Sequence, residues 1–315
     1  MKLIVQIPCY NEEPYLATTL RDIPRAIPGI DEIEILVIDD GSTDRTAEVA
    51  RKEGVRNCVR FRTRKGLAQA FMAGLDASLR AGADLIVNTD ADNQYCGADI
   101  PALIKPILDG DADMVVGDRG IDEAPQFSPL KKFLQRWGSW AVRRISGTDI
   151  PDCTSGFRAY NREAALRINI VSQFTYTLES IIQGGKKNIA IAHVPVRTNT
   201  ETRESRLFSS MGEYVKRSLS TMVRIYTMYE AFKVFTFIGT SFLALGALLA
   251  LRFLFFYVTG SGQGHLQSLI FAAIFTITGF QVLLIGLVAD IISSNRRLIE
   301  DALYRIRRME LGMKP

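Results

Sequence analysis

Two carboxylates separated by a single residue form the most informative short motif of this sequence, Asp90-Ala91-Asp92. The motif directly follows an apolar run, so the chain can turn at the end of a strand and aim both carboxylates at one cation. Mg²⁺ and Mn²⁺ prefer oxygen ligands and keep coordination positions open for the phosphates of a substrate. Asp90 and Asp92 therefore predict a divalent-metal site for a phosphorylated substrate, although acidic turns are also common without a ligand.

Two further polar segments follow apolar runs, PCYNEE at residues 8–13 and DDGSTD at residues 39–44. In open α/β sheets, ligands bind at the carboxyl ends of the strands, where the strand order reverses. We expect both segments to lie beside the carboxylate pair at that edge. No GxGxxG pattern follows the first run, which argues against an ordinary dinucleotide-binding site. Asp40 and Ser42 are expected to cap a helix that begins near Thr43.

The first half of the chain alternates between two periodicities. Short runs rich in β-branched residues indicate strands, and most of the stretches between them carry helical spacing with polar faces. The expected strands are residues 3–8, 32–39, 58–61, 83–90 and 112–118. Such alternation is typical of an α/β domain in which helices cover both faces of a mostly parallel sheet.

Two later segments, residues 234–251 and 266–289, contain no ionisable side chain. Each is long enough to cross a hydrocarbon layer of about 30 Å, which takes roughly 20 helical residues. A pair of buried core helices is the alternative, but two such segments in a row favour a transmembrane hairpin. Lys and Arg flank the hairpin at its outer ends and are missing from the connecting TGSGQGH stretch. Both ends, with the large N-terminal domain, are therefore expected on the cytoplasmic side.

The overall composition fits this arrangement. A formal net charge of +4 is too small to indicate a nucleic-acid partner, and the basic excess lies beside the two spans, where anionic headgroups attract it. The four cysteines are scattered without a CxxC pair, which indicates reduced thiols in a reducing compartment. Apolar residues at helical spacing between residues 207 and 229 predict an amphipathic helix on the membrane surface. Packing against the N-terminal domain or a second subunit of a homo-oligomer is the alternative.

Six segments occur in the order and approximate spacing of one enzyme family: IPCYNEE, VIDDGSTD, KGLAQAFMAGL, DADNQ, VVGDR and TSGFRAYN, which ends at Asn161. On these motifs the sequence resembles the family-2 glycosyltransferases of the GT-A fold. Within that family it is most similar to polyprenyl-phosphate sugar synthases, such as dolichyl-phosphate mannose synthases and undecaprenyl-phosphate glucosyltransferases. The resemblance implies a nucleotide-sugar donor, a polyprenyl phosphate acceptor, and Mg²⁺ or Mn²⁺ as the cofactor.

The same resemblance assigns roles to individual residues. By similarity, the residues around the donor nucleoside are Pro8, Tyr10, Glu12, Val37 and Asp39. The metal and diphosphate site would be formed by Asp90, Ala91, Asp92 and Gln94, with Arg119 contacting phosphate. Asp152 either orients the acceptor or the sugar, or ends a turn. Packing in the core is the alternative for Tyr10, and Glu179 is either an interior acid or a surface residue.

Downstream, residues 198–208 correspond to a segment in which these synthases carry an Arg, a Gly and a Ser-Lys pair that bind phosphate. Ser205 is in place and Arg206 stands for the Lys, but Thr200 occupies the Arg position and Arg203 the Gly position. Arg203 and Arg206 are therefore expected to supply the cationic contacts to the acceptor, since guanidinium groups match phosphate oxygens. A general attraction of these residues to the membrane surface is the alternative.

The predicted organisation has four parts: a GT-A catalytic domain at 1–206, an amphipathic interfacial helix at 207–232, two transmembrane helices at 233–292 and a basic cytoplasmic tail at 293–315. The predicted reaction is inverting transfer of a hexose from a GDP-mannose- or UDP-glucose-type donor to dolichyl or undecaprenyl phosphate at the cytoplasmic membrane face. The expected catalytic residues are Asp90, Asp92, Arg119 and Asp152.

Two other functions stay open from the sequence. A processive polysaccharide synthase shares the fold, but its QxxRW motif would need Gln where this chain has Phe133. A non-catalytic, nucleotide-binding membrane scaffold is the second alternative, because a fold does not prove an activity.

Overall fold

The structure is a computed structural model of the 315-residue chain. It describes residues 1–120, 129–171, 176–199, 219–220, 223–224, 226–227, 229–260 and 262–313. By its contacts the chain divides into two compact units. The first contains residues 1–222 and 304–315, and the second contains residues 223–303.

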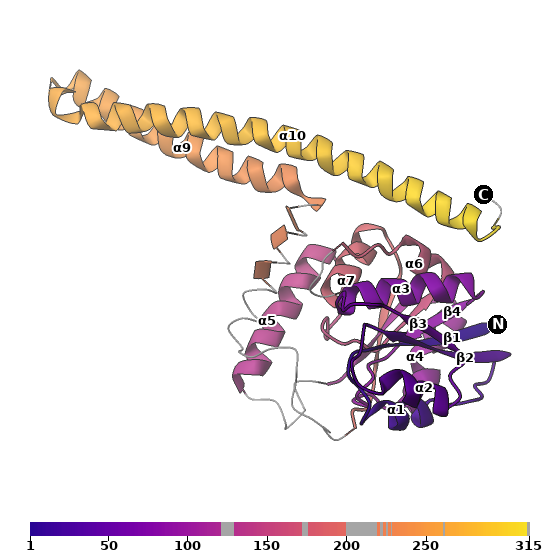
Figure 1. Ribbon diagram of the computed structural model, residues 1–315. Coiled ribbons are helices and arrows are strands. Elements are labelled where there is room, and N and C mark those ends of the chain that lie inside the picture. The colour runs from indigo at the N-terminus through magenta and orange to yellow at the C-terminus, as the bar shows by residue number, and fades with distance from the viewer. Residues whose placement is uncertain are drawn as a thin grey trace. The chain divides into compact units, whose positions relative to one another are not determined.

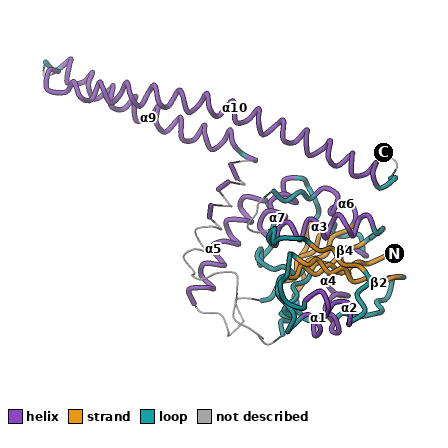
Figure 2. The backbone as a smooth tube through the Cα atoms, viewed as in Figure 1, coloured by secondary structure: helices purple, strands orange, loops and turns teal. Residues whose placement is uncertain are grey.

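A seven-stranded sheet forms the centre of the first unit, in the order β3-β2-β1-β4-β6-β5-β7 (Figures 1 and 2). The strands are β1 (Lys2–Cys9), β2 (Glu32–Asp39), β3 (Asn57–Arg60), β4 (Leu85–Asn88), β5 (Met114–Asp118), β6 (Arg158–Asn161) and β7 (Ile191–Pro195). All neighbouring strands are parallel except β6, which is antiparallel to both β4 and β5. The predicted mostly parallel α/β sheet is thereby confirmed.

Helices cover both faces of this sheet, with α1, α2 and α4 on one side and α3, α6 and α7 on the other (Figure 1). Their bounds are α1 (Leu16–Asp22), α2 (Thr46–Lys52), α3 (Leu67–Arg80), α4 (Ile100–Leu108), α5 (Pro129–Ser146), α6 (Arg162–Arg167) and α7 (Thr177–Lys186). Side chains alternate between the faces along β1. Leu3, Val5 and Ile7 join the hydrophobic core with α1 and α4, whereas Gln6 faces α3, where Gly74 leaves room for its amide.

Strands β6 and β7 were not expected from the sequence. Strand β6 has only four residues and begins with Arg158, whose fully buried guanidinium interrupts the apolar pattern that indicates a strand. Hydrogen bonds to the carbonyls of Cys153, Ser155 and Thr177 satisfy this guanidinium. Strand β7 has mostly part-exposed or exposed side chains and contains His193, so its sequence carries little hydrophobic signal.

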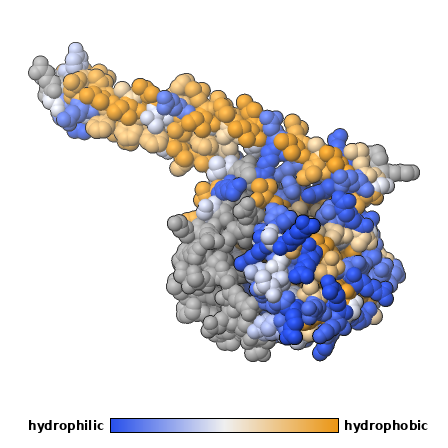
Figure 3. Space-filling view, viewed as in Figure 1, coloured by the Kyte–Doolittle hydropathy of each residue, from blue (hydrophilic) through white to orange (hydrophobic). Residues whose placement is uncertain are grey.

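The second unit consists mainly of two long helices, α9 (Ala231–Val258) and α10 (Leu266–Glu310), joined by a short 3-10 turn at Gly262–His265. Both helices are long and apolar enough to cross a membrane, and only 11% and 17% of their most apolar windows is buried. Within this chain they are therefore not buried as core helices would be, and Figure 3 shows their hydrophobic surface. Most of the predicted interfacial helix at 207–232 lies outside the described residues.

Small residues allow α9 and α10 to pack closely. A Cβ added at Gly279 would lie 2.9 Å from the Gly239 carbonyl oxygen, and one added at Gly246 would lie 3.1 Å from the Ala272 carbonyl oxygen. Close backbone approach through small residues is the usual means of association between membrane helices, because lipid supplies little hydrophobic drive. The hydroxyl of Thr240 donates a hydrogen bond to the Thr236 carbonyl, so this hydroxyl is paired within its own helix.

Candidate active site

The strand order reverses between β1 and β4, and the polar segments identified in the sequence meet at the carboxyl ends of these strands and of β2. Cys9 pairs with Asp39 in the β1–β2 ladder, and Gln6 pairs with Asn88 in the β1–β4 ladder. Tyr10, Asp39 and Asp90 therefore follow three adjacent strands at one edge of the sheet. This switch point is the position at which open α/β sheets bind their ligands.

Asp39 presents a buried acceptor at this edge. Its carboxylate is fully buried, and Oδ1 accepts a hydrogen bond from the Ser42 amide at 2.8 Å. Arg60 Nε lies 3.0 Å from Oδ2 as an ion pair, yet Oδ2 accepts no hydrogen bond from another described residue. A buried oxygen without a hydrogen bond is costly, so the geometry suits a carboxylate that accepts an N–H or O–H from a bound nucleoside.

The hydrogen bonds of the loop after β2 differ from those predicted. The predicted capping of α2 by Asp40 and Ser42 is wrong. Helix α2 begins at Thr46, whose backbone N–H donates a hydrogen bond to the Asp44 carboxylate. Asp40 instead accepts hydrogen bonds from the Lys65 and Gly66 amides at 2.6 and 2.9 Å and so positions the loop before α3.

The Ser42 hydroxyl accepts a hydrogen bond from the backbone N–H of Asn11 at 3.0 Å, which joins this loop to the segment after β1. Its neighbour Gly41 has a φ of +74°, and a Cβ there would lie 2.8 Å from the Thr63 carbonyl carbon. The loops after β1 and β2 are therefore held against each other and against the loop before α3.

The remaining residues assigned to the nucleoside lie in two settings. Tyr10 is part-exposed and stacks under the Arg64 guanidinium, 4.2 Å from the ring centroid. Val37 is fully buried in the hydrophobic core, so only its backbone can border a ligand. Pro8 is buried within β1, and the Glu12 carbonyl accepts the Leu16 amide at the start of α1.

Asp90, Asp92 and Gln94 are part-exposed on the turn after β4. Asp92 Oδ1 accepts a hydrogen bond from the backbone N–H of Gln94 at 3.2 Å, and Ala91 is buried beneath the turn. Gly156 passes so close that an added Cβ would lie 3.0 Å from both Asp90 oxygens. Glycine at 156 thus leaves the space that the Asp90 carboxylate occupies.

This donor set suits a divalent cation that shares its ligands with a substrate. No cluster of three or more His, Cys, Asp and Glu side chains suited to a metal occurs in the described part of the chain. Mg²⁺ needs no such cluster, because it is usually bound through one or two carboxylates and the phosphates of its substrate. Asp90 and Asp92 therefore fit a hard cation that arrives with a diphosphate.

A buried polar network that the motifs did not indicate lies directly under Asp90. The Gln6 amide donates to Asn88 at 2.9 Å, and the Asn88 amide donates to the Tyr176 hydroxyl and to the Gly156 carbonyl, both at 2.8 Å. The Tyr176 hydroxyl lies 2.9 Å from the Cβ position of Gly156, beside the Asp90 oxygens. The only sequence signal for this network was an amide side chain inside each of two apolar strands.

Tyr95 adds a second hydroxyl to this region. It accepts the Gly156 amide at 2.9 Å, and burial raises the pKa of Tyr95 to about 12. Its hydroxyl is therefore neutral at physiological pH and keeps the Gly156 segment against the turn that carries the carboxylates.

Arg119 and Asp152 form a two-pronged ion pair. Arg119 Nε and Nη2 donate to the two Asp152 oxygens at 2.7 and 3.0 Å, and Nη2 also donates to the Thr154 hydroxyl. Burial would raise the pKa of Asp152, but the Arg119 charge and hydrogen bonds from Arg119 and Thr154 lower it below its usual value. Both oxygens of Asp152 are engaged and 1% of its side chain is exposed, so Asp152 orients the guanidinium of Arg119.

The other predicted site residues have mixed outcomes. Glu179 is fully buried and accepts the Val171 amide, so it is an interior acid rather than a surface residue. Arg203, Ser205 and Arg206, assigned to the acceptor phosphate, lie outside the described residues.

Comparison with known proteins decides the family. Residues 4–168, just over half of the chain, match glycosyl transferase family 2. The chain belongs to this family. Its Asp90-Ala91-Asp92 motif and the buried Asp39 thus lie on the scaffold of a family 2 glycosyltransferase.

Similarity to individual relatives extends beyond that domain. A dolichyl-phosphate hexose transferase of Haloferax volcanii is 34% identical over 209 residues, covering 65% of this chain and 86% of the relative. An undecaprenyl-phosphate 4-deoxy-4-formamido-L-arabinose transferase of Pseudomonas paraeruginosa is 30% identical over 314 residues, covering 96% of this chain and 87% of the relative. A polyprenol monophosphomannose synthase of Mycolicibacterium smegmatis is 29% identical, covering 69% of this chain and 84% of the relative.

Solved structures share the fold. A glucosyl-3-phosphoglycerate synthase from Mycobacterium tuberculosis, in complex with phosphoglyceric acid, aligns with a TM-score of 0.58 at 21% identity, covering 71% of this chain and 79% of that chain. The same enzyme in complex with Mn²⁺, UDP-glucose and phosphoglyceric acid aligns with a TM-score of 0.57. At this identity the likeness extends to the fold alone.

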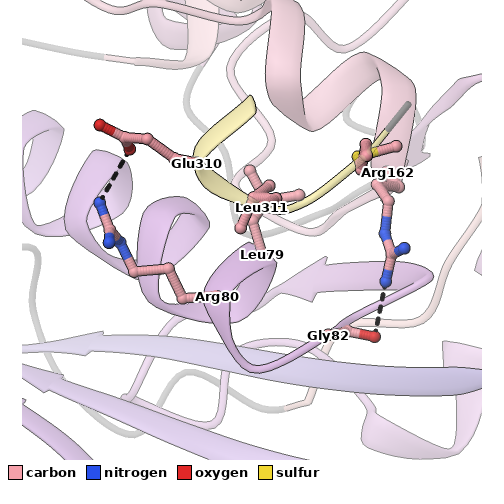
Figure 4. Close-up of a pocket in the computed structure, with 7 residues that line it drawn as sticks. Leu79, Arg80, Gly82, Arg162, Glu310 and Leu311 are labelled. Carbon is pink, nitrogen blue, oxygen red and sulfur yellow. Dashed lines mark hydrogen bonds and ion pairs between the residues drawn. The ribbon is translucent and has the colours of Figure 1, made fainter. Parts of the chain in front are cut away.

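Figure 4 shows a separate cavity. It has a volume of about 400 Å³ and is lined by Leu79, Arg80, Gly82, Arg162, Glu310, Leu311 and Met313. Gly82 precedes β4, so this cavity borders the amino ends of the strands. Its basic side chains are paired within the protein, Arg80 with Glu310 and Arg162 with the Gly82 carbonyl, and it is not the candidate active site.

Proposed function

We propose that this family 2 glycosyltransferase transfers a hexose from a nucleotide-sugar of the GDP-mannose or UDP-glucose type to a polyprenyl phosphate at the cytoplasmic face of a membrane. One observation carries the proposal: the buried carboxylate of Asp39, the carboxylates of Asp90 and Asp92 and the paired Arg119 end or follow strands at one edge of the sheet, in a chain with two membrane-length helices. The names of the three relatives, each a polyprenyl-type transferase or synthase, support this choice of acceptor.

Binding of the donor falls to the loops after β1 and β2. Asp39 Oδ2 can accept an N–H of the base or an O–H of the ribose, and Arg60 lies beside it as a donor. Tyr10 offers an aromatic face, with Arg64 already stacked on it. These residues would hold the nucleoside at the end of β2 and leave the diphosphate directed toward the turn after β4.

The departing nucleoside diphosphate needs positive charge. Mg²⁺ or Mn²⁺ held by Asp90 and Asp92, with Gln94 nearby, would supply that charge as a Lewis acid. Arg119 adds a fixed guanidinium, because Asp152 holds its Nε and Nη2, while Nη1 makes no hydrogen bond to another described residue. A donor that is oriented before the reaction stabilises developing charge without reorganising.

The acceptor needs no basic side chain for activation. A phosphate monoester has a second pKa near 6, so one oxygen is already anionic at neutral pH. That oxygen forms a bond to the anomeric carbon as the bond from this carbon to the diphosphate breaks. A single displacement of this kind inverts the anomeric centre.

The hairpin of α9 and α10 would anchor the enzyme in the bilayer that contains the acceptor. A polyprenyl phosphate is confined to the bilayer, so anchoring the enzyme there replaces a search through solution by local positioning. Lys and Arg at the outer ends of the hairpin, and none in residues 259–265, favour a cytoplasmic catalytic domain.

The test uses the purified full chain in detergent with labelled GDP- and UDP-sugars, a polyprenyl phosphate and Mg²⁺ or Mn²⁺. We expect label from one donor to enter the organic phase, and EDTA to abolish the transfer. Asp92→Asn should lower the rate at least about 100-fold, because metal stabilisation of the leaving group contributes several kcal/mol. Asp111→Asn, an exposed acid on a distant turn, is the matched control. Full transfer in EDTA would contradict the metal role, and no transfer from any donor would favour a scaffold.

A further inference from the structure

Residues 90–96 carry the carboxylates of the candidate metal site, and we call them the metal turn. The turn lies between β4 and a 3-10 turn, η1 (Gly97–Asp99), and is itself neither helix nor strand. Tyr95 joins it to Thr198 through an isolated antiparallel bridge. Because the turn has no regular ladder of its own, the direction of its carboxylates depends on hydrogen bonds that other segments supply.

Helix α1 supplies hydrogen bonds at both ends of the metal turn. The Thr19 hydroxyl donates a hydrogen bond to the Ala91 carbonyl at 2.8 Å, and Asp22 Oδ2 accepts one from the backbone N–H of Gly97 at 2.6 Å. Thr19 and Asp22 are three residues apart, which places them on one face of α1. A Cβ at Gly97 would collide with the backbone carbonyl of Asp22, so glycine permits this close approach.

The Thr19 hydroxyl is buried in apolar surroundings. Only 3% of Thr19 is exposed, and its neighbours Leu16 and Leu20 belong to the hydrophobic core. A hydroxyl in such a place is costly unless it is hydrogen-bonded. A helical threonine can bond to the carbonyl four residues earlier, but here that contact, with Tyr15, is 3.4 Å long. The shorter bond of this hydroxyl therefore goes to Ala91 of the metal turn rather than to its own helix.

Ala91 lies between the two carboxylates, so its carbonyl bears directly on their directions. The carbonyl belongs to the planar peptide unit that leads to Asp92, and a hydrogen bond to it fixes the plane from which Asp92 departs. Asp92 Oδ1 then accepts a hydrogen bond from the backbone N–H of Gln94, and Asn93 between them has a left-handed φ of +57°. Thr19 thus holds the first peptide unit of a tightly folded turn.

We propose that Thr19 is a positioning residue for the metal site, and that its hydroxyl holds Asp90 and Asp92 in the orientation that binds a divalent cation with a nucleoside diphosphate. The proposal rests on the metal site of the proposed function. Helix α1 is suited to this role because it begins where the Glu12 carbonyl accepts a hydrogen bond from the backbone N–H of Leu16. It therefore joins the loop after β1, expected at the nucleoside, to the turn expected at the diphosphate.

Three substitutions on α1 separate the hydroxyl from the packing of the side chain. Thr19→Val keeps the branched shape and removes the hydroxyl, whereas Thr19→Ser keeps the hydroxyl and removes the methyl group. Thr18→Val makes the same change at the adjacent, exposed position. The full chain in detergent is titrated with Mn²⁺ in the presence of UDP or GDP, and electron paramagnetic resonance measures the affinity without turnover.

We expect Thr19→Val to weaken the binding of Mn²⁺ by about 10-fold, the lower end of the effect of removing a group behind metal ligands. Thr19→Ser and Thr18→Val should retain the affinity of the unsubstituted chain. If Thr19 only filled space, the order would be reversed, because valine fills the same space as threonine and serine does not. Thermal unfolding checks that each variant is folded at the temperature of the titration.

Three results would overturn the proposal. Unchanged affinity in Thr19→Val means that the hydroxyl does not hold the turn, and a loss in Thr19→Ser alone assigns the effect to packing. Absence of Mn²⁺ binding by the unsubstituted chain with both diphosphates would remove the metal role of Asp90 and Asp92 as well. By contrast, the expected order of affinities in a chain that transfers no sugar would contradict the proposed transfer and leave the role of Thr19 standing.

Discussion

At the scale of single residues, a network of buried polar side chains lies beneath the candidate site. Gln6, Asn88 and Tyr176 are each almost fully buried, and their hydrogen bonds form one continuous network. The network ends at Gly156, against which the Asp90 carboxylate lies. Groups that orient a metal ligand commonly change metal affinity when they are removed, so we propose that Tyr176 helps to position Asp90.

Tyr176→Phe should weaken the binding of Mn²⁺ with a nucleoside diphosphate by roughly 10- to 100-fold. Titration followed by electron paramagnetic resonance measures this binding without turnover. Tyr160→Phe is the matched control, because Tyr160 is also buried beside Phe71 but its hydroxyl makes no hydrogen bond to another described residue. Equal affinity in the two variants would contradict the positioning role.

At the scale of elements, the hairpin is built on small residues spaced seven apart. Gly239 and Gly246 on α9 approach Gly279 and Ala272 on α10, and Gly286 lies against Phe235. All five small residues are buried. A repeat of seven residues keeps one seam of each helix against its partner. The seam sets how closely the helices approach, and the outward side chains are left for lipid.

Gly279→Val should destabilise the hairpin by about 1–3 kcal/mol, the usual cost of overpacking. The added Cβ would meet the Gly239 carbonyl oxygen and the Leu243 amide, which are backbone atoms that cannot turn aside. Loss of helical circular dichroism during titration with a denaturing detergent measures the change. Gly264→Val, in the connecting turn where nothing lies within 4 Å, should have little effect. The same loss in both variants would show that the seam is not the cause.

At the scale of the whole molecule, the last residues of the chain belong to the same compact unit as the catalytic sheet. The Tyr304 hydroxyl donates to Glu163 at 2.7 Å, and Arg307 donates to the Leu166 and Ile168 carbonyls at 3.2 Å, where α6 ends. Figure 4 shows Glu310 paired with Arg80 of α3. Residues 304–313 therefore pack against the unit that contains the sheet.

Arg307→Ala should lower the free energy of unfolding of the catalytic unit by about 1 kcal/mol, because carbonyls at the end of α6 lose a charged donor that is itself part-exposed. Burial lowers the pKa of Arg307, in keeping with a guanidinium that leaves water for this contact. Thermal unfolding of the full chain in detergent measures the change. Arg305→Ala, exposed on the same turn, is the control. An equal loss in both variants would assign the effect to helix propensity instead.

The sequence by itself determined the family, the mostly parallel α/β sheet and two membrane-length helices. Each of these rests on local patterns: apolar runs with β-branched residues for β1, β2 and β4, long uncharged stretches for α9 and α10, and six motifs in order. Such patterns need only neighbouring residues, so they can be recognised before any fold is known.

Only the tertiary structure decided how the site is assembled. The pairing of Arg119 with Asp152 joins residues 33 apart, and the network of Gln6, Asn88 and Tyr176 spans separations of 82 and 88 residues. The short strand β6, which begins with buried Arg158, escaped prediction because its burial depends on carbonyls from other segments. Buried polar groups are stable only when they have hydrogen-bond partners, and here those partners come from distant parts of the chain. A pattern of neighbouring residues in the sequence does not identify such partners.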